Sequence, residues 1–324
     1  MKTFLKIAGG LVGLVIILLV VGFIYLNSAF PKVYPAEDIT VEANPERLER
    51  GEYLVNHVNL CFDCHSTVNA DMFSFPVVPG TEGMGGRTLE EGALTVHMPN
   101  ITPAALKDWT DGEIARAITE GIDKDDQPLA PMMPYTEYKY LAKEDVYAIV
   151  AYLRTIPAIE NEVPDTELPF PLTIIFPTIP DSATPMALPD SSDPLATGEY
   201  LVRVAGCFFC HTPFKDGQYP EGTEFSGGHE FADARFGVAR SANITPDMET
   251  GIGSWTKEMF IERFKAYADS TGRNIPARGE NGQTAMPWTI LAGMKEQDLD
   301  AIYEYLRTVK PVSNNVTKFS PIAE

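Results

Sequence analysis

CFDCH, residues 61–65, and CFFCH, residues 207–211, hold all four cysteines and two of the five histidines of this 324-residue chain. In each stretch two residues separate the cysteines, and a histidine follows directly. C-x-x-C-H is the attachment pattern of c-type haem. Two thiols on one turn of chain reach the two vinyl groups of the porphyrin, and the histidine presents its ring to the iron from the same side. The two motifs therefore predict two haem c groups.

Three other chemistries also use closely spaced cysteines. A redox-active C-x-x-C belongs in a thioredoxin-like βαβ context, which this sequence does not show. A four-cysteine zinc site or a pair of structural disulfides would leave His65 and His211 without a role. Haem attachment is the interpretation that uses every residue of both motifs.

The two motifs lie in two copies of a longer pattern. GEYLV begins at Gly51 and again at Gly198, and the first copy has one additional residue before its first cysteine. NITP, Trp-Thr, Met-Pro and Tyr-Leu-Arg then follow in the same order in both copies, which indicates a duplicated domain. We predict an anchor over 1–30, domains over 40–157 and 193–313, a proline-rich linker over 158–192 and a tail over 314–324.

Each copy is typical of short helices joined by long loops. Asn44-Pro45 and Asp193-Pro194 each supply an N-cap residue and a proline at the first helical position, and Thr110 begins a capping box. Apolar residues at helical spacing run up to and include the leucine of Tyr-Leu-Arg in both copies: Val146, Ile149, Val150 and Leu153, then Leu299, Ile302, Tyr303 and Leu306. No stretch combines strand alternation with turn residues, so we expect an all-α fold with long loops.

Gly51 and Gly198 lie inside helical patterns, where glycine costs about 1 kcal/mol relative to alanine. We expect a close crossing of two helices, near Tyr152 and Tyr305, to compensate. The linker contains an apolar piece, LPFPLTIIFP at 168–177, which is too short and too rich in proline to span a bilayer. We expect it to pack against or between the domains; contact with a membrane surface is the alternative.

Each iron needs a second axial ligand, and a methionine sulfur suits a low-spin haem. Met133 and Met286 are the methionines at equivalent places in the two copies, and the proline after each favours extended backbone. Met132 is the alternative to Met133. His57, His97 and His229 have no histidine counterpart, so we expect surface or propionate-facing positions. Asn100, Asn243, Trp109 and Trp255 suit either hydrogen bonds to haem propionates or ordinary packing.

The first thirty residues have the character of a membrane segment. Residues 7–26 carry no charge and are long enough to cross a hydrocarbon core of about 30 Å, and Lys2 and Lys6 precede them. We expect a retained anchor with a cytoplasmic N-terminus, a cleaved signal peptide being the alternative. The net charge of −20 excludes a general nucleic-acid-binding surface, because phosphate would be repelled.

The combined order of these motifs, over roughly residues 45–313, resembles the class I cytochrome c domains in the membrane-bound cytochrome c subunits of bacterial alcohol, aldehyde and gluconate dehydrogenases. The repeat and the apolar N-terminal stretch predict two tandem class I cytochrome c domains after one N-terminal transmembrane helix. The resemblance implies electron transfer as the activity. It implies haem attachment at Cys61, Cys64, Cys207 and Cys210, with axial pairs His65–Met133 and His211–Met286. Those subunits usually carry three haem domains and a C-terminal membrane segment, which differs from the pattern here.

We therefore expect a dihaem cytochrome c, anchored in a bacterial inner membrane by a single pass, with its haem domains in the periplasm and no substrate turnover of its own. The main hypothesis is a carrier of single electrons between respiratory complexes, towards a terminal oxidase, with redox protein partners in the membrane or periplasm. The alternative is the electron-accepting subunit of a flavin- or quinoprotein dehydrogenase; a dihaem peroxidase is a third reading. The second copy is seven residues longer between its tryptophan and methionine, which makes 266–285 a candidate loop for partner contact.

Overall fold

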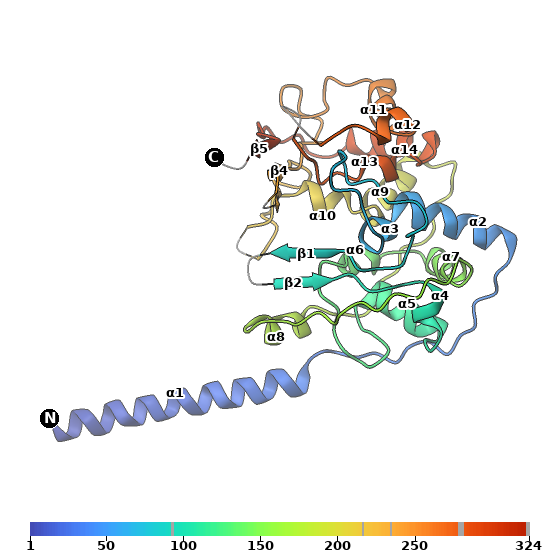
Figure 1. The fold of residues 1–324 in the computed structure, drawn as a ribbon. Coiled ribbons are helices and arrows are strands. Elements are labelled where there is room, and N and C mark those ends of the chain that lie inside the picture. The colour runs from blue at the N-terminus through green and yellow to red at the C-terminus, as the bar shows by residue number, and fades with distance from the viewer. Residues whose placement is uncertain (92–93, 216, 234, 278–281, 322–324) are drawn as a thin grey trace.

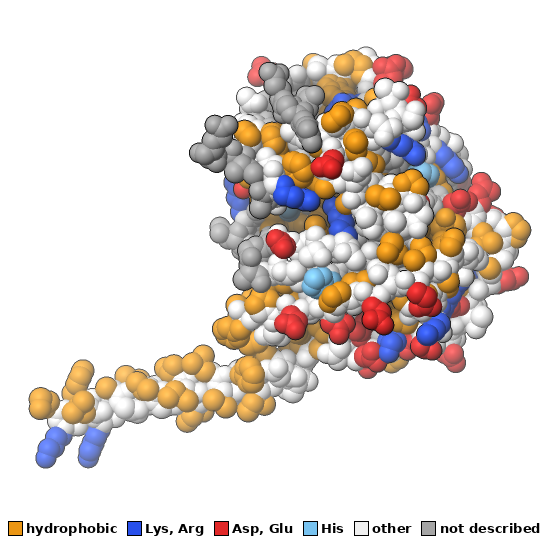
Figure 2. All heavy atoms as spheres, in the orientation of Figure 1, with side chains coloured by type: hydrophobic (Ala, Val, Ile, Leu, Met, Phe, Trp, Pro, Cys, Tyr) orange, Lys and Arg blue, Asp and Glu red, His pale blue; other side chains and the backbone are white. Residues whose placement is uncertain are grey.

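The computed structural model describes residues 1–91, 94–215, 217–233, 235–277 and 282–321. The helix α1 (Lys2–Ala29) projects away from a body made by the rest of the chain (Figure 1). Apolar side chains surround α1 on the visible face, with cations at its N-terminal end (Figure 2). In the described chain it is the one helix long and apolar enough to cross a membrane, with a mean hydropathy of 2.9, and a signal sequence would pass the same test.

The first half of the body consists of short helices around the first cysteine motif. They are α2 (Pro45–Tyr53), the π-helical turn η1 (Leu54–Val58), α3 (Cys61–Cys64), α4 (Pro103–Leu106), α5 (Asp111–Glu120), α6 (Tyr135–Tyr138) and α7 (Lys143–Leu153). The predicted caps are confirmed, because the side chain of Asn44 accepts from Arg47 N and Thr110 forms a capping box with Glu113.

The second half repeats this arrangement and lies above the first in Figure 1. Its helices are α9 (Pro194–Val204), α10 (Cys207–His211), α11 (Lys257–Lys265), α12 (Ser270–Arg273), α13 (Trp288–Leu291) and α14 (Glu296–Leu306). Asp193 caps α9 as predicted. The predicted apolar faces of α7 and α14 are confirmed, since all eight residues are buried.

The predicted close helix crossings are confirmed at both glycines. A Cβ on Gly51 would lie 2.0 Å from the carbonyl oxygen of Ala148 and 2.7 Å from the Cβ of Tyr152. A Cβ on Gly198 would lie at the same two distances, 2.0 Å and 2.7 Å, from Ala301 O and the Cβ of Tyr305. Glycine therefore lets α2 cross α7, and α9 cross α14, with backbones in contact.

The extra residue of the first copy is absorbed in η1. The amide of Asn59 bonds to the carbonyl of Leu54, five residues back, at 2.8 Å. A bond of this span encloses one more residue than an α-helical bond, so η1 restores the register. In the shorter second copy α9 continues as a regular helix to Val204.

The expectation of an all-α fold is wrong in one respect, because the described residues also form two small antiparallel sheets. β1 (Thr88–Glu91) pairs with β2 (Leu94–His97). β4 (Gly237–Arg240) lies between β3 (Glu230–Asp233) and β5 (Phe319–Pro321). Strands of three or four residues are too short to show alternation in the sequence.

The linker packs against the first half, which confirms the main expectation for its apolar piece. It contains the helix α8 (Leu172–Ile175) and the 3₁₀ turn η2 (Phe176–Thr178). Phe176 is buried in a cluster with three residues of or beside β2, namely Leu94, Val96 and Met98. Phe170, in contrast, is 79% exposed.

The described part of residues 266–285, the segment that is longer in the second copy, does not point away from the body. Ile275 O accepts from Phe73 N at 2.7 Å, and Ala277 N donates to Asp71 O at 2.9 Å. The described part of 266–285 therefore contacts the first half of the chain, whereas residues 278–281 lie outside the described residues. The expectation of a loop reserved for an external partner is not supported there.

Candidate functional site

Both cysteine motifs form one short turn of helix. α3 and α10 place the two cysteines of each motif three residues apart, so their side chains lie on the same face. A left-handed residue precedes each turn: Leu60 has φ 56° and Gly206 has φ 71°. The four cysteines form no disulfide, and burial raises the pKa of each thiol to about 12.

The histidine of each motif is held by one hydrogen bond to a backbone carbonyl. His65 Nδ1 lies 2.8 Å from Pro99 O, and His211 Nδ1 lies 2.7 Å from Ala242 O. Because a carbonyl oxygen only accepts, Nδ1 carries the hydrogen and Nε2 keeps its lone pair. Burial lowers the pKa of both imidazoles, which favours the neutral form that binds a metal. The unprotonated Nε2 is the atom that an iron ligand requires.

A glycine packs closely against the backbone near each histidine. Gly85 N donates to His65 O at 2.9 Å, and Gly227 N donates to His211 O at 2.7 Å. A Cβ on either glycine would lie 2.5 Å from the amide nitrogen of the asparagine in NITP, Asn100 or Asn243. These contacts fix the carbonyls that hold the imidazoles.

The asparagines of NITP have a structural role in this arrangement. Asn100 Oδ1 accepts from both the amide and the hydroxyl of Thr102, and Asn100 Nδ2 donates to Ile159 O at 2.8 Å. Asn243 repeats this pattern with Thr245 and Val312. Their polar groups are used within the chain, which favours packing and turn roles over propionate binding.

Met133 and Met286 occupy matching places in the two halves. Each is partly buried against the main apolar core, which also contacts Cys61 and Cys207. Each carbonyl accepts from the second residue beyond it, at 2.8 Å for Met133 and 2.9 Å for Met286, just before α6 or α13. Met132 packs instead against the small cluster that contains Leu94 and Phe176, as Cys64 also does. The match favours Met133 over Met132 as the counterpart of Met286.

The residues of each motif fit a covalently held haem. The thiols lie free on one face of a turn, in apolar surroundings, and the neighbouring imidazole offers Nε2 in the correct tautomer. The described residues contain no group of three or more His, Cys, Asp or Glu side chains placed to hold a metal ion. The zinc alternative therefore gains no support from the described chain.

The two motifs lie close to one another. The buried Asn59, two residues before Cys61, donates from Nδ2 to Val204 O at 2.9 Å, three residues before Cys207. The hydroxyl of Tyr138 donates to Asn59 O. Burial raises the pKa of Tyr138 well above its usual value, and the thiols of both motifs raise it further. The buried Tyr138 thus bonds to the residue that links the segments before the two motifs.

The two motifs differ in the second of the two residues between their cysteines. Asp63 pairs with Arg87 at 3.2 Å, whereas the corresponding Phe209 has its ring 6.1 Å from that of His229. A charged pair beside the first site is thus replaced by an aromatic contact beside the second.

The other histidines singled out from the sequence have separate places. His57 Nδ1 lies 3.1 Å from Ile290 O, at the contact between the halves. His97 Nδ1 lies 3.3 Å from the hydroxyl of Thr88 on the first hairpin. His229 stacks on Phe231, with ring centroids 4.8 Å apart. Both Trp109 and Trp255 pack against the main core.

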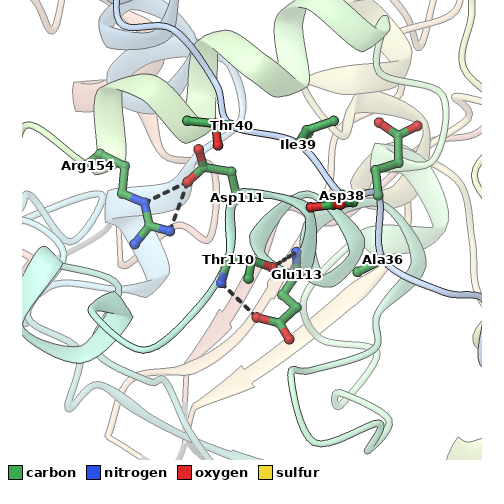
Figure 3. A pocket seen from close by; sticks show the side chains of 9 residues that line it. Ala36, Asp38, Ile39, Thr40, Thr110, Asp111, Glu113 and Arg154 are labelled. Atoms are coloured by element: carbon green, nitrogen blue, oxygen red, sulfur yellow. Dashed lines mark hydrogen bonds and ion pairs between the residues drawn. The ribbon is translucent and has the colours of Figure 1, made fainter.

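The pocket in Figure 3 is separate from both motifs. It has a volume of about 530 Å³ and lies between residues 36–40 and the start of α5. Arg154, from the repeated Tyr-Leu-Arg, donates to Asp111 Oδ1 at 2.9 Å across its floor, and Glu113 is occupied in the capping box. No cysteine or histidine lines this pocket, so it belongs to the framework of the first half.

Sequence reasoning missed the polar residues that join the halves. Tyr53 OH donates to Asp298 Oδ2 at 2.5 Å, and Tyr200 OH donates to Asp145 Oδ2 at 2.6 Å. Both tyrosines belong to the repeated GEYLV, and that repetition was the available signal. Ser74 and Gln283, which connect the halves near Met286, have no counterpart in the repeat.

Comparison with known proteins agrees with this geometry. Residues 195–310 match the cytochrome c family model. The chain is 26% identical over 294 residues to the gluconate 2-dehydrogenase cytochrome c subunit of Pantoea cypripedii, covering 86% of this chain and 63% of that protein. It is 28% identical over 292 residues to the fructose dehydrogenase cytochrome subunit of Gluconobacter japonicus, covering 86% and 56%. It is 26% identical over 285 residues to the cytochrome c subunit of the quinone alcohol dehydrogenase of Gluconobacter oxydans, covering 84% and 56%.

The chain thus spans 56% to 63% of the length of these relatives. A cytochrome c domain implies haem c as its cofactor and electron transfer as its chemistry. Residues 195–310 are a cytochrome c domain, within a chain that is similar over most of its length to the cytochrome c subunits of gluconate, fructose and alcohol dehydrogenases.

Proposed function

We propose that this protein is the dihaem, electron-accepting cytochrome c subunit of a periplasmic dehydrogenase. Haem is attached at Cys61 and Cys64 in a first domain and at Cys207 and Cys210 in a second. His65 with Met133 would hold one iron, and His211 with Met286 would hold the other. The observation that carries this proposal is the repeated histidine geometry, with Nδ1 bonded to a carbonyl and Nε2 left for the iron in both halves.

The chain's own residues bind, orient and shield the two groups. The four thiols provide covalent attachment, and the carbonyls of Pro99 and Ala242 fix the rotation of the imidazoles. The apolar core against both methionines limits the access of water. When bound, haem c supplies a one-electron couple, whose potential methionine ligation raises.

Transfer between the two sites is supported by their fixed contact. The bond from Asn59 to Val204 O ties the segment before one motif to the segment before the other. Asn59 is 1% exposed and Val204 is fully buried, so this link is shielded from solvent. A rigid link of this kind keeps the distance between two redox centres constant.

The names of the relatives favour a dehydrogenase subunit over an independent carrier between respiratory complexes. α1 would serve as a retained anchor, with Lys2 and Lys6 in the cytoplasm and the haem domains in the periplasm. Confinement at the membrane raises the effective concentration of the protein at membrane-bound electron acceptors.

The test is purification of the tagged holoprotein from its native host. We expect a large flavin- or quinoprotein subunit to co-purify, and the haem absorbance to become reduced when that subunit's substrate is added. Cys207→Ala/Cys210→Ala is the control, and it should leave one haem reducible. Reduction of the holoprotein by a respiratory complex alone, with no dehydrogenase bound, would favour the carrier. Rapid peroxide turnover by the reduced protein would favour a peroxidase.

A further inference from the structure

The loop that carries Met286 is held by the first half of the chain. The hydroxyl of Ser74 donates to Met286 O at 2.8 Å. The amide of Ser74 donates to Gln283 Oε1 at 2.7 Å, and Gln283 Nε2 donates to Met72 O at 2.9 Å. Three hydrogen bonds thus join residues 72–74 to residues 283–286, although more than two hundred residues separate the segments.

This connection is buried. Ser74 is 2% exposed and Gln283 is 5% exposed. Gln283 Oε1 also accepts from Thr284 N at 3.0 Å, and the hydroxyl of Thr284 accepts from Met286 N at 3.1 Å. The network therefore extends from the first half to both backbone polar groups of Met286. Buried hydrogen bonds of this kind fix a local conformation, because leaving any one of them unmade is costly.

Aromatic rings reinforce the same contact. The ring of Phe73 stacks on that of Tyr267, with centroids 6.0 Å apart. Tyr267 stacks in turn on Trp288, two residues beyond Met286, at 5.4 Å. The stack runs from the first half to the helix that follows the methionine.

The backbone of the first-half segment is strained. Ser74 has φ 69° and Phe75 has φ 47°, which lie in the left-handed region that side chains rarely adopt. Such strain persists only where the surroundings determine the conformation, and it is concentrated at functional positions. Here the strained residue is the one whose hydroxyl reaches Met286.

Met286 is held by the other half of the chain, but Met133 has no matching hydrogen bond among the described residues. Met133 O accepts from Tyr135 N, as Met286 O does from Trp288 N, but within the described residues no group of the second half donates to Met133 O. The chain lengths agree with this asymmetry. Nineteen residues separate His65 from Gly85, whereas fifteen separate His211 from Gly227. The longer segment of the first copy and the longer segment of the second, before Met286, are the two that meet.

We infer that Ser74 and Gln283 are positioning residues for Met286, so that the first half of the chain sets the strength of methionine ligation at the second haem. This inference rests on the proposed assignment of Met286 as an axial ligand. The hydrogen bonds of Ser74 and Gln283 hold the backbone of Met286 in place and so oppose displacement of its sulfur from the iron. It makes ligation at the second haem depend on the docking of the two halves, whereas within the described residues no hydrogen bond from the second half reaches Met133 O.

The experiment compares Ser74→Gly with the wild-type holoprotein by proton NMR of the reduced form, in which each ligated methionine gives its own upfield methyl signal. Glycine removes the hydroxyl and relieves the strain at φ 69°, so the fold should be retained. We expect the Met286 methyl signal to shift or broaden while the Met133 signal is unchanged. In the oxidised variant the methionine-dissociated form of the second haem should increase about fivefold, as expected for the loss of one hydrogen bond. The methionine–iron charge-transfer band should weaken accordingly.

Two further variants keep the test decisive. Gln283→Leu removes the side-chain bonds to Ser74 N and Met72 O and should act in the same direction. Ser226→Ala is the matched control, because this 2% exposed serine donates to Thr223 O within its own loop. The control should retain both methyl signals. Unchanged signals and an unchanged band in both Ser74→Gly and Gln283→Leu would overturn the inference. Absence of a second methyl signal in the wild-type protein would instead overturn the assignment of Met286.

Discussion

The hydroxyl of Tyr200 donates to Asp145 Oδ2 at 2.6 Å and accepts from Ala142 N at 3.1 Å, so a tyrosine of the second half caps the start of α7 in the first. Tyr53 repeats both contacts in the opposite direction, with Asp298 Oδ2 at 2.5 Å and Lys295 N at 3.1 Å. The exchange of equivalent contacts is that of a two-fold interface between identical partners. One duplicated unit thus packs on its copy within a single chain, and a continuous core joins them.

Tyr200→Phe should lower the free energy of unfolding by about 2 kcal/mol, because Ala142 N loses its acceptor and the buried Asp145 loses a donor. The measurement is denaturant unfolding of the holoprotein. Tyr147→Phe is the control, since its hydroxyl bonds to the exposed Glu37, and its change should be about 0.5 kcal/mol or less. Equal stability of the two variants would show that the contact between the halves contributes nothing.

Gly198→Ala should destabilise the protein by about 3 kcal/mol, because the new Cβ would lie 2.0 Å from Ala301 O and would force α9 away from α14. Gly51→Ala should have a similar effect on the first half. The thermal midpoint of the holoprotein measures both. Glu199→Ala, at an exposed position on the same helix, is the control. A wild-type midpoint in Gly198→Ala would exclude a backbone contact at this crossing.

Glu137→Gln should stabilise the protein at neutral pH. Burial raises the pKa of Glu137, although Arg203, at 3.8 Å, and Lys139 oppose the shift. A carboxyl group whose pKa is higher in the folded state than in the unfolded state reduces stability as the pH rises above its unfolded pKa, and the full cost is reached above the folded pKa. The difference in thermal midpoint between variant and wild type should therefore be small near pH 4 and grow towards pH 7.

The control for this pH dependence is Glu144→Gln, because Glu144 pairs with Arg47 and is 64% exposed. It should not reproduce the trend. A midpoint difference for Glu137→Gln that is independent of pH would contradict the account of a buried, partly compensated carboxylate.

The acidic surface should make complex formation depend on salt. A net charge of −20 favours a basic docking patch on the redox partner, and added salt screens such attraction. The second-order rate of haem reduction by the partner should fall steadily as ionic strength rises from about 0.01 M to about 1 M. A rate that does not change with salt would exclude electrostatic docking.

The sequence predicted the parts of the fold that rest on local chemistry. The caps at Asn44, Thr110 and Asp193 and the apolar faces of α7 and α14 follow from residue type and spacing, so each could be recognised. The crossings at Gly51 and Gly198 could be predicted because glycine destabilises the interior of a helix, so its presence there indicates a compensating close contact. The duplication itself placed the two candidate sites in register.

What the sequence did not predict depends on tertiary contacts. The short strands β1 to β5 owe their pairing to neighbouring loops, because no strand of three or four residues specifies itself. Ser74 and Gln283 meet across the contact between the halves, and nothing in either segment alone indicates the other. The one-residue difference before the cysteines was visible, but its consequence, the π turn η1, required the backbone.

The most direct measurement is intact mass spectrometry of the matured protein, together with a pyridine haemochrome spectrum. We expect the mass of the polypeptide plus two covalently bound haem groups, and a spectrum in which both vinyl groups of each porphyrin are saturated. Cys61→Ala/Cys64→Ala and Cys207→Ala/Cys210→Ala should each lose one haem. A matured protein with the mass of the bare polypeptide, or with a single haem that survives in both double variants, would exclude covalent attachment of one haem at each motif.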